Sequence, residues 1–501
     1  MPPFECSQEL DNLVGIDLSG CKQFEELPDL SKAPRLKWVN LSCCESLRYL
    51  HSSVLSSAAL VTLILNGCTK LQSVKGEKRL KSLEKISVNG CSSLEEFAVS
   101  LDLFKMFNLS HKGIQMPGTP VRRKGKRKSH NLEEDLRPLT SLKEIKLSYC
   151  LQRDMDWIKY NLPSLQHMYM LKLDQCKVTT LPENIKNLGN LRVLSLENCD
   201  ELLRLPKLPS SINYFSAINC TSLVSVSDLV NLANEMWGST RFLTFKNCLK
   251  LDEHSCKLIM KSVQLVMVCA AFDNMVRKSS DLHDYSYNSV QLCLPGSKVP
   301  QEIKYRSTES FITIDLPKLS NLRGFIYSVV LSPSGETKKH GTKIICKRHL
   351  RENTRESWVS SDIEGLNTDH VYIWYDPFHC DGILKYNAPS VCFEFCVTND
   401  KGEVDDSMCI KECGVGLISV SELPSVLEEL DWDSDKKKDL VKRVELITGQ
   451  RITLTSIEQS DEEENNGMKN QMGNQQGNLS EHSHKIVGML LITLIIFNIT
   501  N

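Results

Sequence analysis

Four cysteines late in the chain have a spacing that could bind a metal ion. Cys392, Cys396, Cys409 and Cys413 form a C-x3-C-x12-C-x3-C pattern, and thiolates are common ligands of structural zinc. Both pairs, however, lie in runs of alternating apolar and polar residues, which are typical of β-strands. Residues four apart in a strand are separated by about 13 Å, too far for two thiolates that each lie about 2.3 Å from one zinc ion. We therefore expect ordinary strand thiols and no metal.

The other reactive side chains do not form a recognisable catalytic pattern. The histidines of the same region accompany no serine or cysteine in a known nucleophile motif; they are His340, His349, His370 and His379. No G-x-x-x-x-G-K-[ST] loop is present to hold a nucleotide phosphate. The sequence therefore predicts a protein that is not an enzyme and uses no cofactor.

Nine further cysteines recur at one position of a repeated phrase, L-x-x-L-x-L-x-x-C. The copies include LVGIDLSGC at 13–21, LVTLILNGC at 60–68 and LRVLSLENC at 191–199. Apart from one wide gap, successive cysteines are 21 to 28 residues apart, which is typical of leucine-rich repeats. Each is expected to be a small buried side chain with a weak S–H donor. The nine are Cys21, Cys44, Cys68, Cys91, Cys150, Cys176, Cys199, Cys220 and Cys248.

The wide gap, between Cys91 and Cys150, is interpreted as one weak repeat plus an insertion. FKMFNLSHK at 104–112 fits the phrase as a degenerate copy, and the polar stretch at about 119–133 is the inserted loop. Its cationic run could be a nuclear-localisation signal, a contact for a polyanion or a solvated loop without a specific role. The run consists of Arg122, Arg123, Lys124, Lys126, Arg127 and Lys128.

The repeats predict one strand each, with leucines inward and the residues between them outward. The outward side chains would form a concave face, the usual binding surface of such an array. Large apolar ones such as Trp38, Ile64, Met170 and Tyr214 are candidate contact anchors, or scattered surface residues without a role. The candidate partner-binding residues are Asp17, Trp38, Asn40, Thr62, Ile64, Lys85, Glu144, Lys146, Met170, Lys172, Ser195 and Tyr214.

The chain divides into five parts by composition and periodicity. We expect an α/β leucine-rich-repeat solenoid (horseshoe) followed by an all-β sandwich or jelly roll. The parts are the repeats at 1–251, a capping helix and connector at 252–285, the β-sandwich at 286–455, a polar linker at 456–485 and an apolar tail at 486–501. The 14 residues Ile486–Ile499 would span about 21 Å as a helix, less than a hydrocarbon core of about 30 Å. This tail is therefore either a short membrane anchor or a segment packed on protein.

The charge balance and the cysteine content limit where the protein can be located and what it can bind. The chain has 60 Lys and Arg residues and 62 Asp and Glu residues, so its overall charge is nearly balanced. This balance argues against a general polyanion binder such as a nucleic-acid-binding protein. The N-terminal residues have no signal-peptide pattern, so the 20 cysteines are expected to be free thiols in a reducing compartment. We expect a cytoplasmic protein, with nuclear or membrane association as alternatives.

Three segments together resemble a known family. They are the cysteine-bearing repeats, FLTFKNCLKLDE at 242–253 and LPGSKVPQEIKYRSTESFITIDLP at 294–317. They are similar to the C-terminal half of plant TIR-type intracellular immune receptors, nucleotide-binding leucine-rich-repeat proteins with a jelly-roll/Ig-like post-LRR domain (C-JID).

The resemblance implies that the array and the post-LRR domain together bind a pathogen effector or a host protein in defence signalling, and that binding frees receptor chains to oligomerise. It also implies TIR NADase and nucleotide-binding domains, which this sequence does not contain. The alternative function is a membrane-tethered or nuclear scaffold that docks a host protein.

Overall fold

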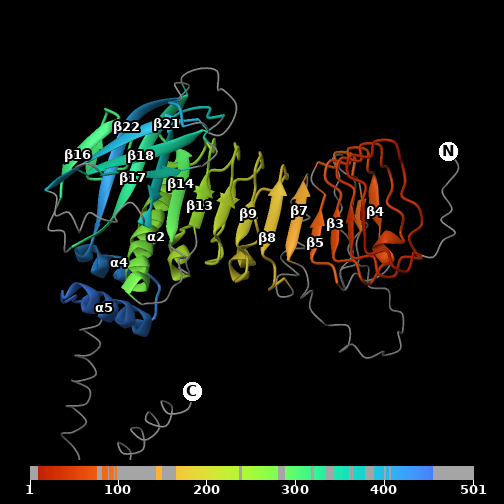
Figure 1. Cartoon of the computed structure of the whole chain (residues 1–501), viewed down its shortest axis with the longest axis horizontal. Coiled ribbons are helices and arrows are strands. Elements are labelled where there is room, and N and C mark those ends of the chain that lie inside the picture. The colour runs from red at the N-terminus through yellow and green to blue at the C-terminus, as the bar shows by residue number, and fades with distance from the viewer. Residues whose placement is uncertain are drawn as a thin grey trace, which may run out of the picture.

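One long sheet runs through the molecule (Figure 1). The computed structural model of the chain describes residues 10–75, 82–98 (without 89 and 95), 143–148, 165–235, 240–279, 288–316, 321–333, 342–350, 353–359, 363, 365–377, 389–399, 402–404 and 408–454. The first part of the sheet contains one parallel strand from each described repeat. These strands are β1 (Gly15–Asp17), β2 (Trp38–Asn40), β3 (Thr62–Ile64), β5 (Lys85–Ser87), β7 (Glu144–Ser148), β8 (Met170–Asp174), β9 (Val193–Ser195), β11 (Tyr214–Ser216) and β13 (Thr240–Thr244).

The opposite side of each coil is closed by short extended segments and 3-10 turns. No α-helix occupies that side in the coils that the structure describes. The elements there are β4 (Ser73–Lys75) with β6 (Glu96–Ala98), β10 (Arg204–Leu205) with β12 (Ser225–Val226), and the 3-10 helices η1 (Val54–Ser56), η4 (Glu183–Asn187) and η5 (Val230–Asn234). Between the two sides, the repeat leucines are almost completely buried, as at Leu63, Leu171 and Leu194. The predicted solenoid is confirmed.

Each coil turns at the residue before the repeat cysteine. This residue has a left-handed backbone, with φ between 57° and 75°. Glycine and asparagine tolerate that region best, and they occupy six of the eight described positions. The eight are Gly20, Cys43, Gly67, Gly90, Gln175, Asn198, Asn219 and Asn247.

The turn directs the cysteine thiol inward, toward the preceding coil. Cys199 Sγ lies 3.1 Å from the carbonyl oxygen of Leu173, and Cys220 Sγ lies 3.0 Å from that of Leu196. Such a thiol satisfies a buried carbonyl that the turn would otherwise leave unpaired. Cys21 differs from the prediction, because it is exposed and no described coil precedes it.

The wide gap in the repeat pattern adds no strand to the sheet. β5 pairs directly with β7, with Ile86 opposite Ile145. A strand at 104–112 therefore has no place between them, and our interpretation of that segment as a repeat within this sheet is wrong. Residues 104–112 and the basic run at 122–128 lie outside the described residues.

The sheet does not end with the last repeat. β14 (Ser289–Pro295) pairs in parallel with β13, and antiparallel strands then follow in the order β20, β17, β22 and β15, which completes a 14-stranded sheet. Their bounds are β20 (His370–Tyr375), β17 (Leu322–Pro333), β22 (Met408–Ser419) and β15 (Tyr305–Ser307). A second, four-stranded sheet contains β16 (Phe311–Asp315), β21 (Ser390–Thr398), β18 (Lys343–Leu350) and β19 (Asn353–Val359).

The two faces of the long sheet belong to different cores. On one face, Val290 and Leu292 of β14 continue the leucine core of the repeats, where α2 (Glu253–Ser279) packs. On the other face, Cys293 lies in a separate aromatic core between the two sheets, together with Trp374 and Phe393. The concave face of the repeats thus becomes the inner face of a β-sandwich once the second sheet covers it.

The end of the described chain is helical, which differs from the predicted all-β domain. α4 (Leu423–Glu429) carries a proline in its first turn. α5 (Ser434–Thr448) begins where the Asp433 carboxylate accepts the Lys436 N–H, at 2.7 Å, and ends at Gly449 with φ 67°. These are ordinary start and stop signals.

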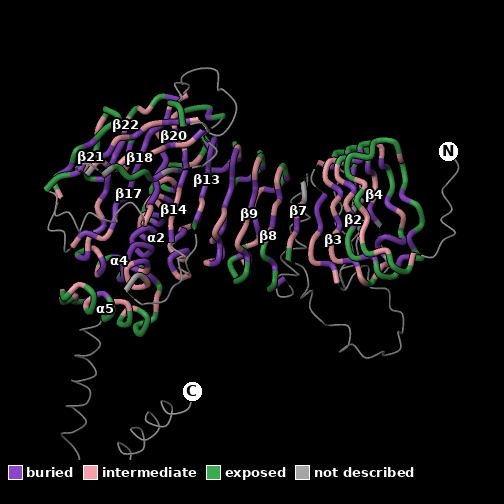
Figure 2. The backbone as a smooth tube through the Cα atoms, in the orientation of Figure 1, coloured by how far each residue is buried: buried purple, intermediate pink, exposed green. Residues whose placement is uncertain are grey.

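The helices α2 and α5 differ in composition and burial. α2 is, within the described residues, the helix long and apolar enough to cross a membrane by length and composition. Since 67% of that window is buried inside the fold, α2 is a core helix. α5, by contrast, is exposed over much of its surface (Figure 2).

Candidate functional site

The open part of the long sheet is its concave face, from β1 to β13. Strand register lines up its outward side chains in two rows. The first row consists of Gly15, Trp38, Thr62, Lys85, Glu144, Met170, Val193, Tyr214 and Phe242. The second row consists of Asp17, Asn40, Ile64, Ser87, Lys146, Lys172, Ser195, Ser216 and Thr244.

Trp38 lies at the N-terminal end of the first row and is 41% exposed. A Cβ atom on Gly15 would come within 1.8 Å of Trp38 Cε2. The indole therefore lies against the bare backbone of the neighbouring strand, which only glycine permits.

The C-terminal half of the first row is apolar. Met170, Val193, Tyr214 and Phe242 lie on four neighbouring strands, and each is partly exposed. The rings of Tyr214 and Phe242 are stacked, with centroids 5.2 Å apart and an interplanar angle of 13°. These four residues, which we call the apolar row, end beside β14, where the second sheet begins to cover the face.

The second row is polar except for Ile64, and its serine and threonine side chains are buried. Ser195 was a predicted contact residue but is completely buried; its hydroxyl donates to Asp174 Oδ1 at 2.5 Å. Ser216 is also buried and donates to Glu197 Oε1 at 2.8 Å. The longer acidic side chains thus lie over the serines, and Ser195 is corrected from a contact residue to a support for Asp174.

Lys146 and Lys172 stand beside one another in the middle of this row. Burial, followed by the nearby charge of Lys85, lowers the pKa of Lys146. In the first row, Lys85 Nζ forms an ion pair with Glu144 Oε2 at 3.0 Å.

A buried histidine joins the last repeat to the sandwich. His370 Nε2 accepts the backbone N–H of Asn247 at 2.9 Å, and Nδ1 lies 2.8 Å from the carbonyl oxygen of Thr368. The Asn247 side chain donates to Gly365 O at 2.8 Å and accepts the N–H of Asn367 at 3.0 Å. These contacts fix the sandwich against the end of the concave face.

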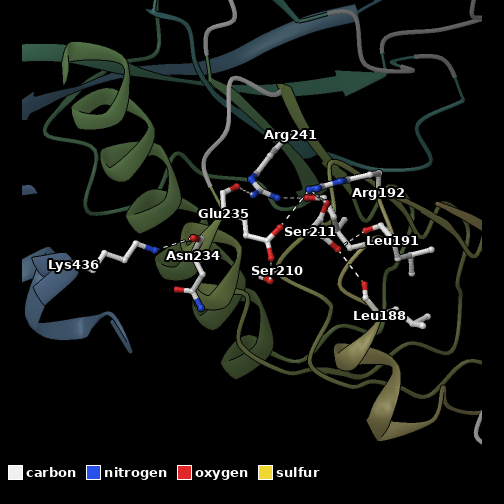
Figure 3. A network of polar contacts seen from close by, with 10 residues as sticks. Leu188, Leu191, Arg192, Ser210, Ser211, Asn234, Glu235, Arg241 and Lys436 are labelled. Atoms are coloured by element: carbon white, nitrogen blue, oxygen red, sulfur yellow. Dashed lines mark hydrogen bonds and ion pairs between the residues drawn. The ribbon is translucent and has the colours of Figure 1, made fainter. Parts of the chain in front are cut away.

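A second set of polar contacts lies within the last repeats, near the start of β13, and includes one link to α5 (Figure 3). The buried Arg241 donates to the carbonyl oxygens of Ile212 and Glu235, and burial lowers the pKa of Arg241 to about 10. Lys436 of α5 donates to the carbonyl oxygen of Asn234 at 2.9 Å. The helices that follow the sandwich are therefore also attached to the repeats.

The remaining candidates are dispersed. Asp17 and Asn40 are joined by a 3.2 Å hydrogen bond at the N-terminal end of the face, and Thr62 and Ile64 are partly exposed on β3. Phe242 was missed because its repeat is shortened. The spacing of FLTFKNC from its cysteine would have located it.

The zinc-like cysteines are divided between the two sheets. Cys392 and Cys396 lie on β21, whereas Cys409 and Cys413 lie on β22. Cys413 Sγ is 3.1 Å from the carbonyl oxygen of Glu309, and burial raises the pKa of Cys413 to about 12. No group of three or more metal-ligating side chains occurs in the part of the chain that the structure describes.

Comparison with known proteins identifies relatives from plants. Protein SUPPRESSOR OF npr1-1, CONSTITUTIVE 1 of Arabidopsis thaliana is 28% identical over 82% of this chain and 30% of its own length. Disease resistance protein RPS4B of the same plant is 24% identical over 81% of this chain and 38% of its own length. Disease resistance protein RPP5, again from Arabidopsis thaliana, is 25% identical over 79% of this chain and 23% of its own length. The chain therefore spans about a third of the length of these relatives.

The fold comparison adds little to this. No family model matches the chain. A leucine-rich-repeat protein of Leptospira interrogans, LIC12759, covers 48% of this chain and 62% of its own, with 15% identity and a TM-score of 0.23, too low to support an argument. The sequence relationships show that this chain is a distant homologue of plant TIR-NBS-LRR resistance proteins and matches their C-terminal portion.

Proposed function

We propose that this chain is the recognition module of a plant intracellular immune receptor, and that it binds a pathogen effector or a host protein on its concave face. The observation that supports this most directly is the apolar row, which leaves stacked aromatic rings partly exposed on an otherwise well-packed sheet. Partly buried aromatic side chains in the middle of a surface are typical anchors of protein interfaces. The resemblance to resistance proteins supplies the biological setting.

The continuous sheet makes the binding surface composite. The apolar row ends where the second sheet starts. His370 binds the last repeat to the sandwich, and Lys436 binds α5 to the repeats. A partner lying on the apolar row would therefore meet the sandwich as well. No catalytic step is part of this proposal, since the matched regions of the relatives are the repeats and the C-terminal domain.

Partner capture from plant tissue tests the proposal. The full chain, fused to a proximity-labelling enzyme, is compared with the double variant Tyr214→Ser/Phe242→Ser in infected and uninfected leaves. Tyr49→Ser is the matched control, because Tyr49 is 46% exposed on the other side of the coils.

We expect the double variant to lose a discrete set of labelled proteins while its melting temperature stays within about 3 °C of the wild type, and Tyr49→Ser to retain that set. An unchanged set in the double variant would refute binding on the apolar row.

A further inference from the structure

Lys146 and Lys172 form an unfavourable pair at the centre of the concave face. The two residues are directly opposite one another on β7 and β8, and neighbouring strands are only about 4.8 Å apart. Like charges in such positions destabilise a sheet. Burial and the charge of Lys85 lower the pKa of Lys146 most, and the charge of Lys172 lowers it further.

The charges of Glu144 and Asp174 favour the protonated form of Lys146, but within the described residues neither carboxylate forms an ion pair with Lys146 or Lys172. Glu144 is bound to Lys85. Asp174 accepts the Ser195 hydroxyl at 2.5 Å and the N–H of Glu197 at 3.1 Å.

The side chains of Lys146 and Lys172 form no hydrogen bond or ion pair within the described residues. Both lysines are partly buried, so solvent screens their repulsion less than at a fully exposed site.

Lysines on the outer side of the coils behave differently. Lys177 is paired with Glu201 at 3.2 Å, and Lys207 with Asp228 at 3.6 Å. Each of these lysines has its acid one coil further on. Lys85, on the concave face itself, is paired in the same way with Glu144. Lys146 and Lys172 differ from these three lysines because their side chains have no such partner among the described residues.

We propose that the partner places an acidic peptide segment, through one or two Asp or Glu carboxylates, on Lys146 and Lys172, with an apolar side chain next to it on the apolar row. This inference rests on the proposed function and specifies the partner's chemistry. Met170 belongs to the apolar row and lies on the same strand as Lys172, two residues away on the same face. A bound carboxylate would remove the repulsion between the two lysines and pair each of them.

A peptide fits this surface better than a nucleic acid. A phosphate backbone is bound through many cations, whereas here two unpaired lysines share the face with Glu144, Asp174 and Glu197. The net charge of the chain is −2. Short, mixed acidic and apolar recognition is what this arrangement can provide.

Selection from a random 12-residue peptide display library tests the inference on the full chain. The variants are Lys146→Ala/Lys172→Ala, the matched control Lys177→Ala/Lys207→Ala, and Tyr214→Ser/Phe242→Ser. We expect the wild type and the control to enrich peptides in which Asp or Glu is close to Phe, Leu or Tyr. The lysine variant should lose the acidic preference and bind the selected peptides at least tenfold more weakly, while its melting temperature stays equal or rises slightly.

Three results would overturn the inference: peptides without acidic enrichment, acidic enrichment that persists on the lysine variant, or tighter binding of a 12-nucleotide single-stranded RNA that depends on the same lysines. The outcome for the proposed function is separate. If the wild type selects apolar peptides without acids, and Tyr214→Ser/Phe242→Ser loses them, the proposed function stands and the lysine inference fails. If that aromatic variant selects the same peptides as the wild type, the proposed function fails.

Discussion

Replacing His370 with leucine should weaken the junction between the repeats and the sandwich and remove part of the pH dependence of stability. The ring is completely buried, and Nε2 accepts the Asn247 N–H. Leucine leaves that N–H buried without an acceptor, which costs about 1–3 kcal/mol. His370→Gln, whose amide oxygen can accept the same N–H, should recover part of this loss.

The pH dependence follows from the direction of the pKa shift. Burial, reinforced by the charge of Lys246, lowers the pKa of His370 from its usual 6.5, against the opposing effect of the Thr368 carbonyl. The unfolded chain therefore takes up the proton first as the pH falls. The stabilisation is complete above pH 6.5 and is lost below it, by at most about 1.4 kcal/mol per pH unit until the folded-state pKa is reached.

Urea denaturation at pH 7.5 and pH 5.5, followed by tryptophan fluorescence, measures both effects. The wild type should lose more stability between the two pH values than His370→Leu does. His254→Gln, at an exposed position in the first turn of α2, should behave like the wild type. If His370→Leu showed the full wild-type decrease, other groups would be responsible and this reasoning would be refuted.

Three other predictions concern separate parts of the chain. Arg241→Met should lower the free energy of unfolding by about 2–4 kcal/mol, because two buried carbonyl oxygens lose their donor. Arg192→Gln loses a 3.0 Å hydrogen bond to the Ser211 carbonyl oxygen and a 3.4 Å ion pair with Glu235, both from a partly exposed side chain, and should cost less, about 1 kcal/mol, in the same assay. Alkylation by iodoacetamide in the native state should be fast at the exposed Cys21 and slow at the buried Cys199, because hydrogen bonding with Cys220 and burial raise the pKa of Cys199; mass spectrometry of timed samples would show equal rates if the thiols were equally accessible. If the apolar tail is a membrane anchor, a tagged full chain is found in the membrane fraction of plant cells and deleting residues 485–501 moves it to the soluble fraction. An unchanged distribution would favour the alternative, a tail packed on protein.

The sequence was sufficient to predict the repeats, because the leucine positions in each copy of the repeated phrase indicate which face of the strand is apolar. Leu63 and Leu194 are buried at the predicted positions, and the alternating runs that became β17 and β20 were recognised in the same way. The periodicity of apolar residues indicates which side chains must be buried. In a stacked array, the neighbouring coil covers those side chains.

The sequence was insufficient where the outcome depends on which strands pair. β13 pairs with β14 although the 27-residue helix α2 separates them in the sequence, and β5 pairs with β7 although a long insertion separates them. Nothing local to these strands specifies such neighbours. The burial of Ser195 is a similar case, because its outward position was predicted correctly but the Asp174 side chain of the preceding strand, β8, covers it. The helix α5, by contrast, had readable signals in Asp433 and Gly449.

Amide hydrogen exchange of the full chain, alone and bound to a protein recovered in the capture experiment, tests the central claim most directly. That claim is a single concave recognition surface that continues into the sandwich. Binding should slow exchange in β8, β9, β11 and β13 and in β19 of the second sheet, which contacts β20 through the Trp374–Ser357 hydrogen bond. It should leave the outer coil segments β10 and β12 unchanged. Protection confined to the outer segments, with the concave strands unaffected, would contradict it.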